Sequence, residues 1–181
     1  RLSRERLGAD IMVLPAGASG NASEVLFCAE PVNVYLPADV ERTVAGIDGV
    51  EQATPQFFTQ TVNQSCCSVI GVTRVVGIDM KTDFIVGPWL VGGTLEGGAL
   101  PPDGIILGAA APPIEGGQAS ILGSVFYCVG TLEPTGSSVD ETIFMDVNAA
   151  RTIAAESPYL ESVWLNVDPF DAISCVMVKV K

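Results

Sequence analysis

VERTVAGIDGVEQATPQFF, residues 40–58, has the apolar spacing of a helix in its first part and the composition of a strand in its second part. Its first part places three apolar residues on one helical face: Val40, Val44 and Ile47. With Pro37 at a position that suits a first helical turn, this spacing predicts a short helix over residues 37–49. Residues 50–62 then have the composition of a long strand. The chain is therefore expected to pass directly from a helix into a strand.

A polar turn and a second apolar run, residues 68–79, follow this strand. The two runs together predict an antiparallel hairpin. Cys66 and Cys67 would lie at or just past its tip, and this adjacent pair is the most distinctive chemical feature of the sequence.

The remaining pattern continues with strands and one further helix. Asp146 suits the N-cap of a helix over residues 147–156, which ends before Pro158. Residues 79–123 are rich in Gly and Pro and predict an irregular insert, interrupted by a short strand that begins at Gly104. Other runs have the composition of strands: residues 9–17, 24–36, 123–133, 142–146, 161–168 and 173–181.

This order of elements predicts an α+β fold with mixed or antiparallel sheets and two short helices on one side. The Gly- and Pro-rich connection separates two groups of strands, each with its own helix, which suggests two related lobes. We expect a single domain over residues 1–181. Its possible lobes are residues 1–78 together with 124–181, and the insert 79–123.

Composition limits the classes of function. Apolar residues make up 48% of the chain and charged residues 17%, which indicates a packed globular protein rather than a disordered one. With 21 acidic and 9 basic residues, the net charge of −12 repels nucleic-acid phosphates, so we expect no nucleic-acid partner. Gly or Pro interrupts every long apolar run before it reaches the roughly 20 residues of a membrane-spanning helix.

The chain contains no histidine, which excludes Ser-His-Asp and Cys-His catalysis and the usual metal sites that use His. Carboxylate pairs occur in loops, Asp79 with Asp83 and Asp140 with Glu141, where a solvated surface is expected more often than an acid–base pair. The spacings of phosphate-binding and calcium-binding loops are also missing from the sequence. We therefore expect no enzyme activity and no cofactor.

Five cysteines are present: Cys28, Cys66, Cys67, Cys128 and Cys175. Cys28, Cys128 and Cys175 lie in apolar runs and are expected to be small buried residues. The polar neighbours of Cys66 and Cys67 favour an exposed tip, where three interpretations stay open: packing, a thiol contact to a soft metal such as Cu(I), or a vicinal disulfide. Adjacent strand residues point to opposite faces, so both thiolates reach one metal only if the backbone turns there.

Four segments can be compared with a known family: RLGADIMVLPAGA (6–18), VERTVAGIDGVEQATPQ (40–56), VVGIDMKTDFIVGPWLVGGTL (75–95) and VGTLEPTGSSVDETIFMDVNAAR (129–151). In this order they resemble the extracytoplasmic domain, or MacB-like periplasmic core domain, of FtsX-like ABC-transporter permeases. SCCS at residues 65–68 also resembles a vicinal cysteine pair at the hairpin tip in a subset of that family.

The resemblance implies an α+β domain of porter-like βαβ units, held outside the membrane between the first two membrane helices of a permease. The domain would be periplasmic or extracellular, excised from a parent protein of the cell membrane. It would carry no catalysis, because a separate ABC ATPase subunit hydrolyses ATP in the cytoplasm. The implied partners are that ATPase, a second permease copy, and an unknown substrate or extracytoplasmic partner.

Two hypotheses from other classes of protein are alternatives to the permease domain. The first is a free-standing secreted module that binds a ligand or a soft metal through Cys66 and Cys67. The second is a cysteine-dependent enzyme, against which the acidic surroundings of the pair argue, because they do not favour a thiolate.

Overall fold

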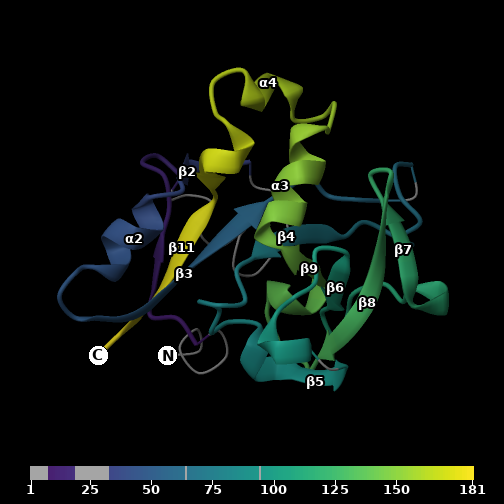
Figure 1. Ribbon diagram of the computed structural model, residues 1–181, viewed down its shortest axis with the longest axis horizontal. Coiled ribbons are helices and arrows are strands. Elements are labelled where there is room, and N and C mark those ends of the chain that lie inside the picture. The colour runs from purple at the N-terminus through teal and green to yellow at the C-terminus, as the bar shows by residue number, and fades with distance from the viewer. Residues whose placement is uncertain (1–7, 19–32, 64, 94) are drawn as a thin grey trace.

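The structure, a computed structural model, describes residues 8–18, 33–63, 65–93 and 95–181 (Figure 1). The strands and helices run in the order β1 (Ile11–Val13), β2 (Leu36–Pro37), α2 (Val40–Ala45), β3 (Val50–Phe58), β4 (Arg74–Ile78), β5 (Leu90–Gly93), β6 (Gly104–Leu107), β7 (Gln118–Ile121), β8 (Ser124–Leu132), β9 (Thr142–Asp146), α3 (Val147–Ala155), α4 (Glu161–Trp164), β10 (Ala172–Ile173) and β11 (Cys175–Val180).

One mixed sheet dominates the fold. Within the described residues it contains nine strands in the order β1-β11-β3-β4-β9-β6-β8-β5, with β7 paired to β8 outside this path. β4 runs parallel to β9 and β6 runs parallel to β8, whereas their other pairings, with β3, β9, β5 and β7, are antiparallel. The expected α+β fold is confirmed.

The helices and the hairpin predicted from residue spacing are also present. The first helix is α2, and the strands on either side of Cys66 and Cys67, β3 and β4, pair antiparallel. The carboxylate of Asp146 accepts hydrogen bonds from the backbone N–H groups of Asn148 and Ala149, at 3.0 and 3.3 Å. This cap satisfies two of the donors that the first turn of α3 leaves without an intrahelical partner.

The expectation of an irregular insert over residues 79–123 is wrong in part. This segment supplies β5, β6 and β7, and β6 lies inside the sheet between β9 and β8. The short strand expected from Gly104 is β6. β5 and β7 were not expected, because their four residues are too few for a periodic pattern. Gly108, just after β6, is required by close packing, because a Cβ there would lie 2.2 Å from the carbonyl oxygen of Val139.

Both faces of the sheet are covered, as the adjacent residues Phe57 and Phe58 of β3 show. Phe57 is 0% exposed and packs in a cluster with Ala150 and Ile153 of α3. Phe58 is 2% exposed and belongs to a cluster on the opposite face, with Ile85 and other residues of the connection after β4. Adjacent strand residues point to opposite faces, so each phenylalanine fills a separate core.

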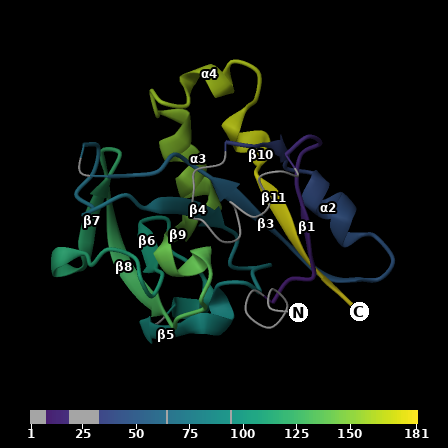
Figure 2. The same cartoon turned by 180° about the vertical axis from the view of Figure 1, so that it is seen from behind.

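Two other predicted strands need comment. Residues 161–168 were expected to be extended, but they begin with the helix α4 at the end of the molecule seen uppermost in Figures 1 and 2. Residues 24–32 of the strand predicted over 24–36 lie outside the described residues, and so does Cys28. Of the other cysteines expected in cores, Cys175 is buried and Cys128 is half-buried.

The first and last strands lie side by side. β1 pairs antiparallel with β11, and the Asp10 carboxylate accepts a hydrogen bond of 3.0 Å from the N–H of Val180. The C-terminus therefore lies close to residue 10, at the end of the molecule opposite α4 (Figure 2). Among the described residues, no helix has the length and apolar content needed to cross a membrane.

Candidate functional site

The cysteine pair lies in the connection between β3 and β4, residues 59–73. A single bridge between Val62 and Thr73 closes this loop. Inside it, the N–H groups of Cys66 and Cys67 both donate to the carbonyl oxygen of Asn63, at 3.2 and 3.0 Å. The backbone therefore turns at the pair. Such a turn is needed for two adjacent thiols to lie on the same side of the chain and reach one metal ion.

This loop packs against the β7–β8 hairpin. Ser68 donates its N–H to the carbonyl of Ser120 at 2.9 Å, and its hydroxyl accepts the N–H of Ser120 at 2.8 Å. The sulfur of Cys67 accepts a hydrogen bond of 3.4 Å from the N–H of Leu122 in the β7–β8 turn. The loop thus covers the outer edge of β7, where unpaired backbone groups would otherwise be open.

The expected exposure of the cysteines is therefore wrong. Cys66 and Cys67 are half-buried and pack against the core cluster that contains Phe57. Ser65 and Ser68 beside them are exposed, but the β7–β8 hairpin against which the loop packs lies more than 50 residues later in the sequence. No local pattern could have indicated that contact.

Both cysteines are free thiols. Burial, reinforced by the neighbouring thiol of Cys66, raises the pKa of Cys67 to about 12. Cys67 is therefore protonated near neutral pH, and the thiolate that a nucleophile requires is disfavoured. Within the described residues, no group of three or more Cys, Asp, Glu or His side chains is placed to hold a metal ion. The soft metal ligands in this loop are the sulfurs of Cys66 and Cys67.

A polar hollow of about 270 Å³ lies beside Cys66. It is lined by Gln60, Thr61, Asn63, Ser65, Cys66 and Tyr159. The hydroxyl of Ser157 donates to the side-chain oxygen of Gln60, which ties the loop 59–73 to the segment between α3 and α4. The hollow is thus built from two segments that lie about a hundred residues apart in the sequence.

Exposed apolar side chains occur on the same two segments, and we refer to them as the distal apolar residues. They are Ile70, Val72, Tyr159 and Leu165. Val72 is 73% exposed and Leu165 is 79% exposed. Both segments lie on the half of the molecule away from the C-terminus (Figures 1 and 2). Other large apolar side chains, among them Ile47, Val91 and Phe170, are exposed as well, so exposure alone does not make these four residues an interaction surface.

The carboxylates that the sequence singled out have structural roles. Asp83 is partly buried and accepts hydrogen bonds from the N–H groups of Ile85, Val86 and Gly87, the last at 2.7 Å. Asp140 accepts from the backbone of Thr135 at 2.7 Å. These two are not merely solvated, as the sequence suggested, because each organises a turn at the border of the sheet.

The described fold is that of the extracytoplasmic domains of ABC-type transporter permeases. The periplasmic region of MacB from Actinobacillus actinomycetemcomitans matches with a TM-score of 0.55 and 12% identity, over 94% of this chain and 73% of that one. A domain of a putative permease from Porphyromonas gingivalis matches with a TM-score of 0.51 and 16% identity, over 80% and 63%. The extracellular domain of the noncanonic ABC-type transporter YknZ from Gram-positive bacteria matches at 0.48 and 14%, over 86% and 82%.

The sequence comparisons add nothing to this likeness. No protein-family model matches the sequence, and the search of curated proteins finds no match. At 12 and 16% identity the structural likenesses establish the fold alone. The family resemblance of the four sequence segments thus agrees with the fold.

Proposed function

We propose that this chain is the extracytoplasmic domain of an ABC-type export or mechanotransmission permease. In this role it couples ATP hydrolysis in the cytoplasm to substrate extrusion or to engagement of a partner outside the membrane. The observation that carries the proposal is the likeness to the MacB periplasmic region, which extends over 94% of the chain.

The placement of the first and last described strands supports the proposal. β1 and β11 are neighbours in the sheet, so membrane helices attached before and after the domain would leave it side by side. The loop 59–73 and α4 lie away from that end (Figure 1). A domain held at one end by two adjacent attachments transmits their movement as a rigid body to the other end.

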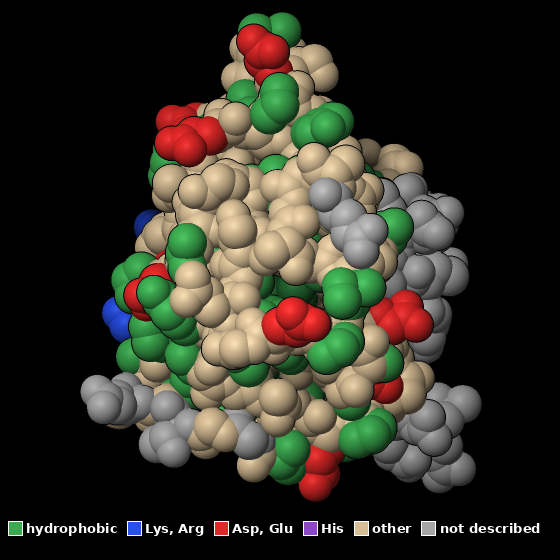
Figure 3. Space-filling model, turned by 90° about the vertical axis from the view of Figure 1, so that its right-hand side faces the viewer, with side chains coloured by type: hydrophobic (Ala, Val, Ile, Leu, Met, Phe, Trp, Pro, Cys, Tyr) green, Lys and Arg blue, Asp and Glu red, His purple; other side chains and the backbone are tan. Residues whose placement is uncertain are grey.

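The partners follow from this arrangement. An ABC ATPase subunit and a second permease copy would meet the membrane part of the parent protein rather than this domain. The substrate or extracytoplasmic partner would meet the distal apolar residues. Acidic side chains are spread over the face that carries the β7–β8 hairpin, whereas Lys and Arg are visible only at its edge (Figure 3), which supports a partner other than nucleic acid.

A topology experiment on the parent protein tests the proposal. A cysteine introduced at Leu165 should react with a membrane-impermeant maleimide from outside intact cells, since this side chain is 79% exposed. An ABC ATPase should co-purify with the parent protein, and Leu165→Asp should alter its ATPase rate or its partner binding without loss of the complex. A parent protein without membrane spans on both sides of the domain would contradict the proposal.

The cysteine pair supports a second candidate function, a soft-metal site in a free-standing secreted module. The observation that favours it is the turn at Asn63, which brings the thiols of Cys66 and Cys67 together. Two thiols side by side are suitable ligands for Cu(I). Titration of the reduced chain with Cu(I) against a chromophoric competitor should give one ion per chain, and the Cys66→Ser/Cys67→Ser variant should bind none.

A further inference from the structure

The β7–β8 hairpin leaves part of one strand edge open. β8 pairs with β7 over Ser124–Tyr127, whereas its pairing with β6 begins only at Tyr127. Within the described residues, no strand therefore pairs with the other edge of β8 at residues 124–126. Pro101 and Pro102 precede β6 and prevent its extension along this edge, because proline has no N–H to donate.

The register shows which backbone groups face this open edge. Ile121 and Ser124 flank a two-residue turn whose residues, Leu122 and Gly123, both have positive φ. In such a hairpin the flanking pair exchanges hydrogen bonds, and alternate residues point their N–H and C=O groups away from the partner strand. Val125 therefore points its backbone groups away from β7.

Tyr127, two residues further along, confirms this pattern. Its N–H leaves the hairpin on the same side and donates to the carbonyl oxygen of Asp103 at 2.8 Å. Val125 is thus the position where the same edge continues without a strand beside it.

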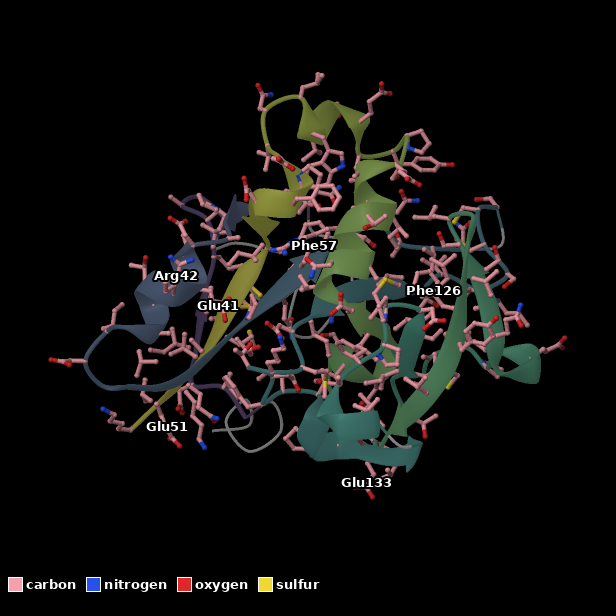
Figure 4. The ribbon with its side chains drawn as sticks, viewed as in Figure 1. Glu41, Arg42, Glu51, Phe57, Phe126 and Glu133 are labelled. Atoms are coloured by element: carbon pink, nitrogen blue, oxygen red, sulfur yellow. The ribbon has the colours of Figure 1, made fainter. Side chains whose placement is uncertain are left out.

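A groove of about 470 Å³ lies along this edge, between β8 and α3. Exposed Pro102 and half-buried Ala149 supply apolar surface, whereas Phe126 and Ile153 lie beneath it and are 3% and 4% exposed. Figure 4 shows Phe126 on the side of β8 that faces α3. Asn148 and Thr152 of α3 are exposed on the opposite wall. The groove therefore combines an apolar floor, polar side chains and an open strand edge, which are the elements of strand addition.

The charge of the groove determines which kind of peptide segment it favours. Asp103 and Asp146 line it, and no Lys or Arg does so among the described residues. The chain as a whole has a net charge of −12. A basic segment would gain from this field, whereas an acidic one would be repelled.

We infer that this groove binds a short extended peptide segment carrying a basic side chain, which adds to the open edge of β8 at Val125. The peptide backbone pairs with the N–H and C=O of Val125, an apolar side chain lies on Ala149, and a Lys or Arg reaches Asp103. The groove binds such a segment whether or not the chain serves a permease, so failure of this inference leaves the proposed function untouched.

The test uses a capped lysine–valine–threonine–valine–lysine peptide, labelled for fluorescence anisotropy, and the 181-residue chain. We expect saturable binding, with amide NMR shifts at Val125 and along α3. Val125→Pro removes the N–H that faces the groove without removing a bond to β7, and should weaken binding about tenfold. Asp103→Asn should weaken it about threefold, and less at high salt.

Controls keep the test decisive. Glu133→Gln removes an exposed carboxylate at the β5 end of the molecule (Figure 4) and should leave binding unchanged. If Val125→Pro fails to fold, Thr152→Trp fills the groove from an exposed helix position and should abolish binding. Equal binding of a glutamate version, of a peptide N-methylated at alternate residues, or of lysinamide alone would overturn the inference, as would the absence of saturable binding.

Discussion

The indole Nε1 of Trp164 donates a hydrogen bond of 2.7 Å to the carbonyl oxygen of Ala154, near the end of α3. The same ring lies 4.8 Å from the ring of Tyr35 and 6.3 Å from that of Phe57, measured between centroids. Trp164 thus joins α4 to α3 and covers one end of the core. The alternating residues 161–168 resemble a strand, but this buried aromatic contact favours the helical turn instead.

Replacement of Trp164 should show how much this junction stabilises the fold. Trp164→Phe keeps an aromatic ring but removes one of the donors to the Ala154 carbonyl, which still accepts the N–H of Ser157 at 3.2 Å. We therefore expect a loss of about 0.5 to 1.5 kcal/mol in the free energy of unfolding. Trp164→Ala should lose about 3 to 5 kcal/mol, because it also leaves a cavity. Urea denaturation measures both, with Leu165→Ala as a control that should change the value by less than about 0.5 kcal/mol. Equal effects of the Phe and Leu165 variants would contradict this role.

The sequence predicts those parts of the fold that depend on local signals. The helix α3 could be located because Asp146 caps it and Pro158 follows it, and the hairpin β3–β4 because two long apolar runs flank a polar turn. The strands β5 and β7 could not be predicted, because each is only four residues long. The short strand expected from Gly104 is β6, but its place inside the sheet, between β9 and β8, could not be predicted either.

The candidate site shows the same division. Residue types and spacing placed Cys66 and Cys67 in the connection between two strands, which is where they lie. Their burial depends on Ser120 and Leu122, which follow more than 50 residues later. The open edge at Val125 could not be predicted from the sequence either. It arises because β8 pairs with β7 from Ser124 onward but with β6 only from Tyr127 onward.

Gly77 in β4 should tolerate no side chain. A Cβ there would lie 2.6 Å from the Cβ of Ala150 and 3.0 Å from the Cα of Val147. Gly77→Ala would push α3 away from the sheet, and we expect a loss of about 1 to 3 kcal/mol in the free energy of unfolding. Thermal or urea denaturation of the purified chain measures the change.

A double-mutant cycle isolates the cause. Ala150→Gly alone should cost about 1 kcal/mol, because glycine disfavours the helix. Combined with Gly77→Ala it removes the overlapping methyl group, so the double variant should be more stable than the sum of the single losses predicts. Strict additivity would show that the close approach of β4 and α3 is not responsible.

The cysteine pair should contribute modestly to stability. If the tip were exposed, as its polar neighbours in the sequence suggest, Cys66→Ser/Cys67→Ser would leave folding nearly intact. Since both side chains are half-buried against the core, we now expect a loss of about 1 to 2 kcal/mol. Ser65→Ala, at an exposed position of the same loop, serves as the control. A melting temperature equal to that of the wild type would restore the original expectation of an exposed tip.

Asp83 should make stability depend on pH. Burial raises the pKa of this carboxyl above its ordinary value, the hydrogen bonds from Gly87, Val86 and Ile85 oppose the rise, and the nearby charge of Asp79 adds to it. A raised pKa means that the folded chain holds the proton more tightly than the unfolded chain. The contribution of Asp83 is therefore most favourable at low pH and is lost as the pH rises from about 4 through the higher pKa of the folded state.

Urea denaturation between about pH 3 and pH 7 measures this dependence. The comparison is with Asp83→Asn, which cannot ionise. The free energy of unfolding of the wild type, relative to that of Asp83→Asn, should fall as the pH increases. A pH-independent effect of the amide on stability does not alter this slope. Asp79→Asn should reduce the slope, because it removes the like charge that helps to raise the pKa of Asp83. Glu133→Gln, which removes an exposed carboxylate that is not among the charges shifting the pKa of Asp83, should leave the slope as it is. A relative stability that instead rises with pH would mean that the three backbone N–H groups outweigh burial and lower the pKa of Asp83.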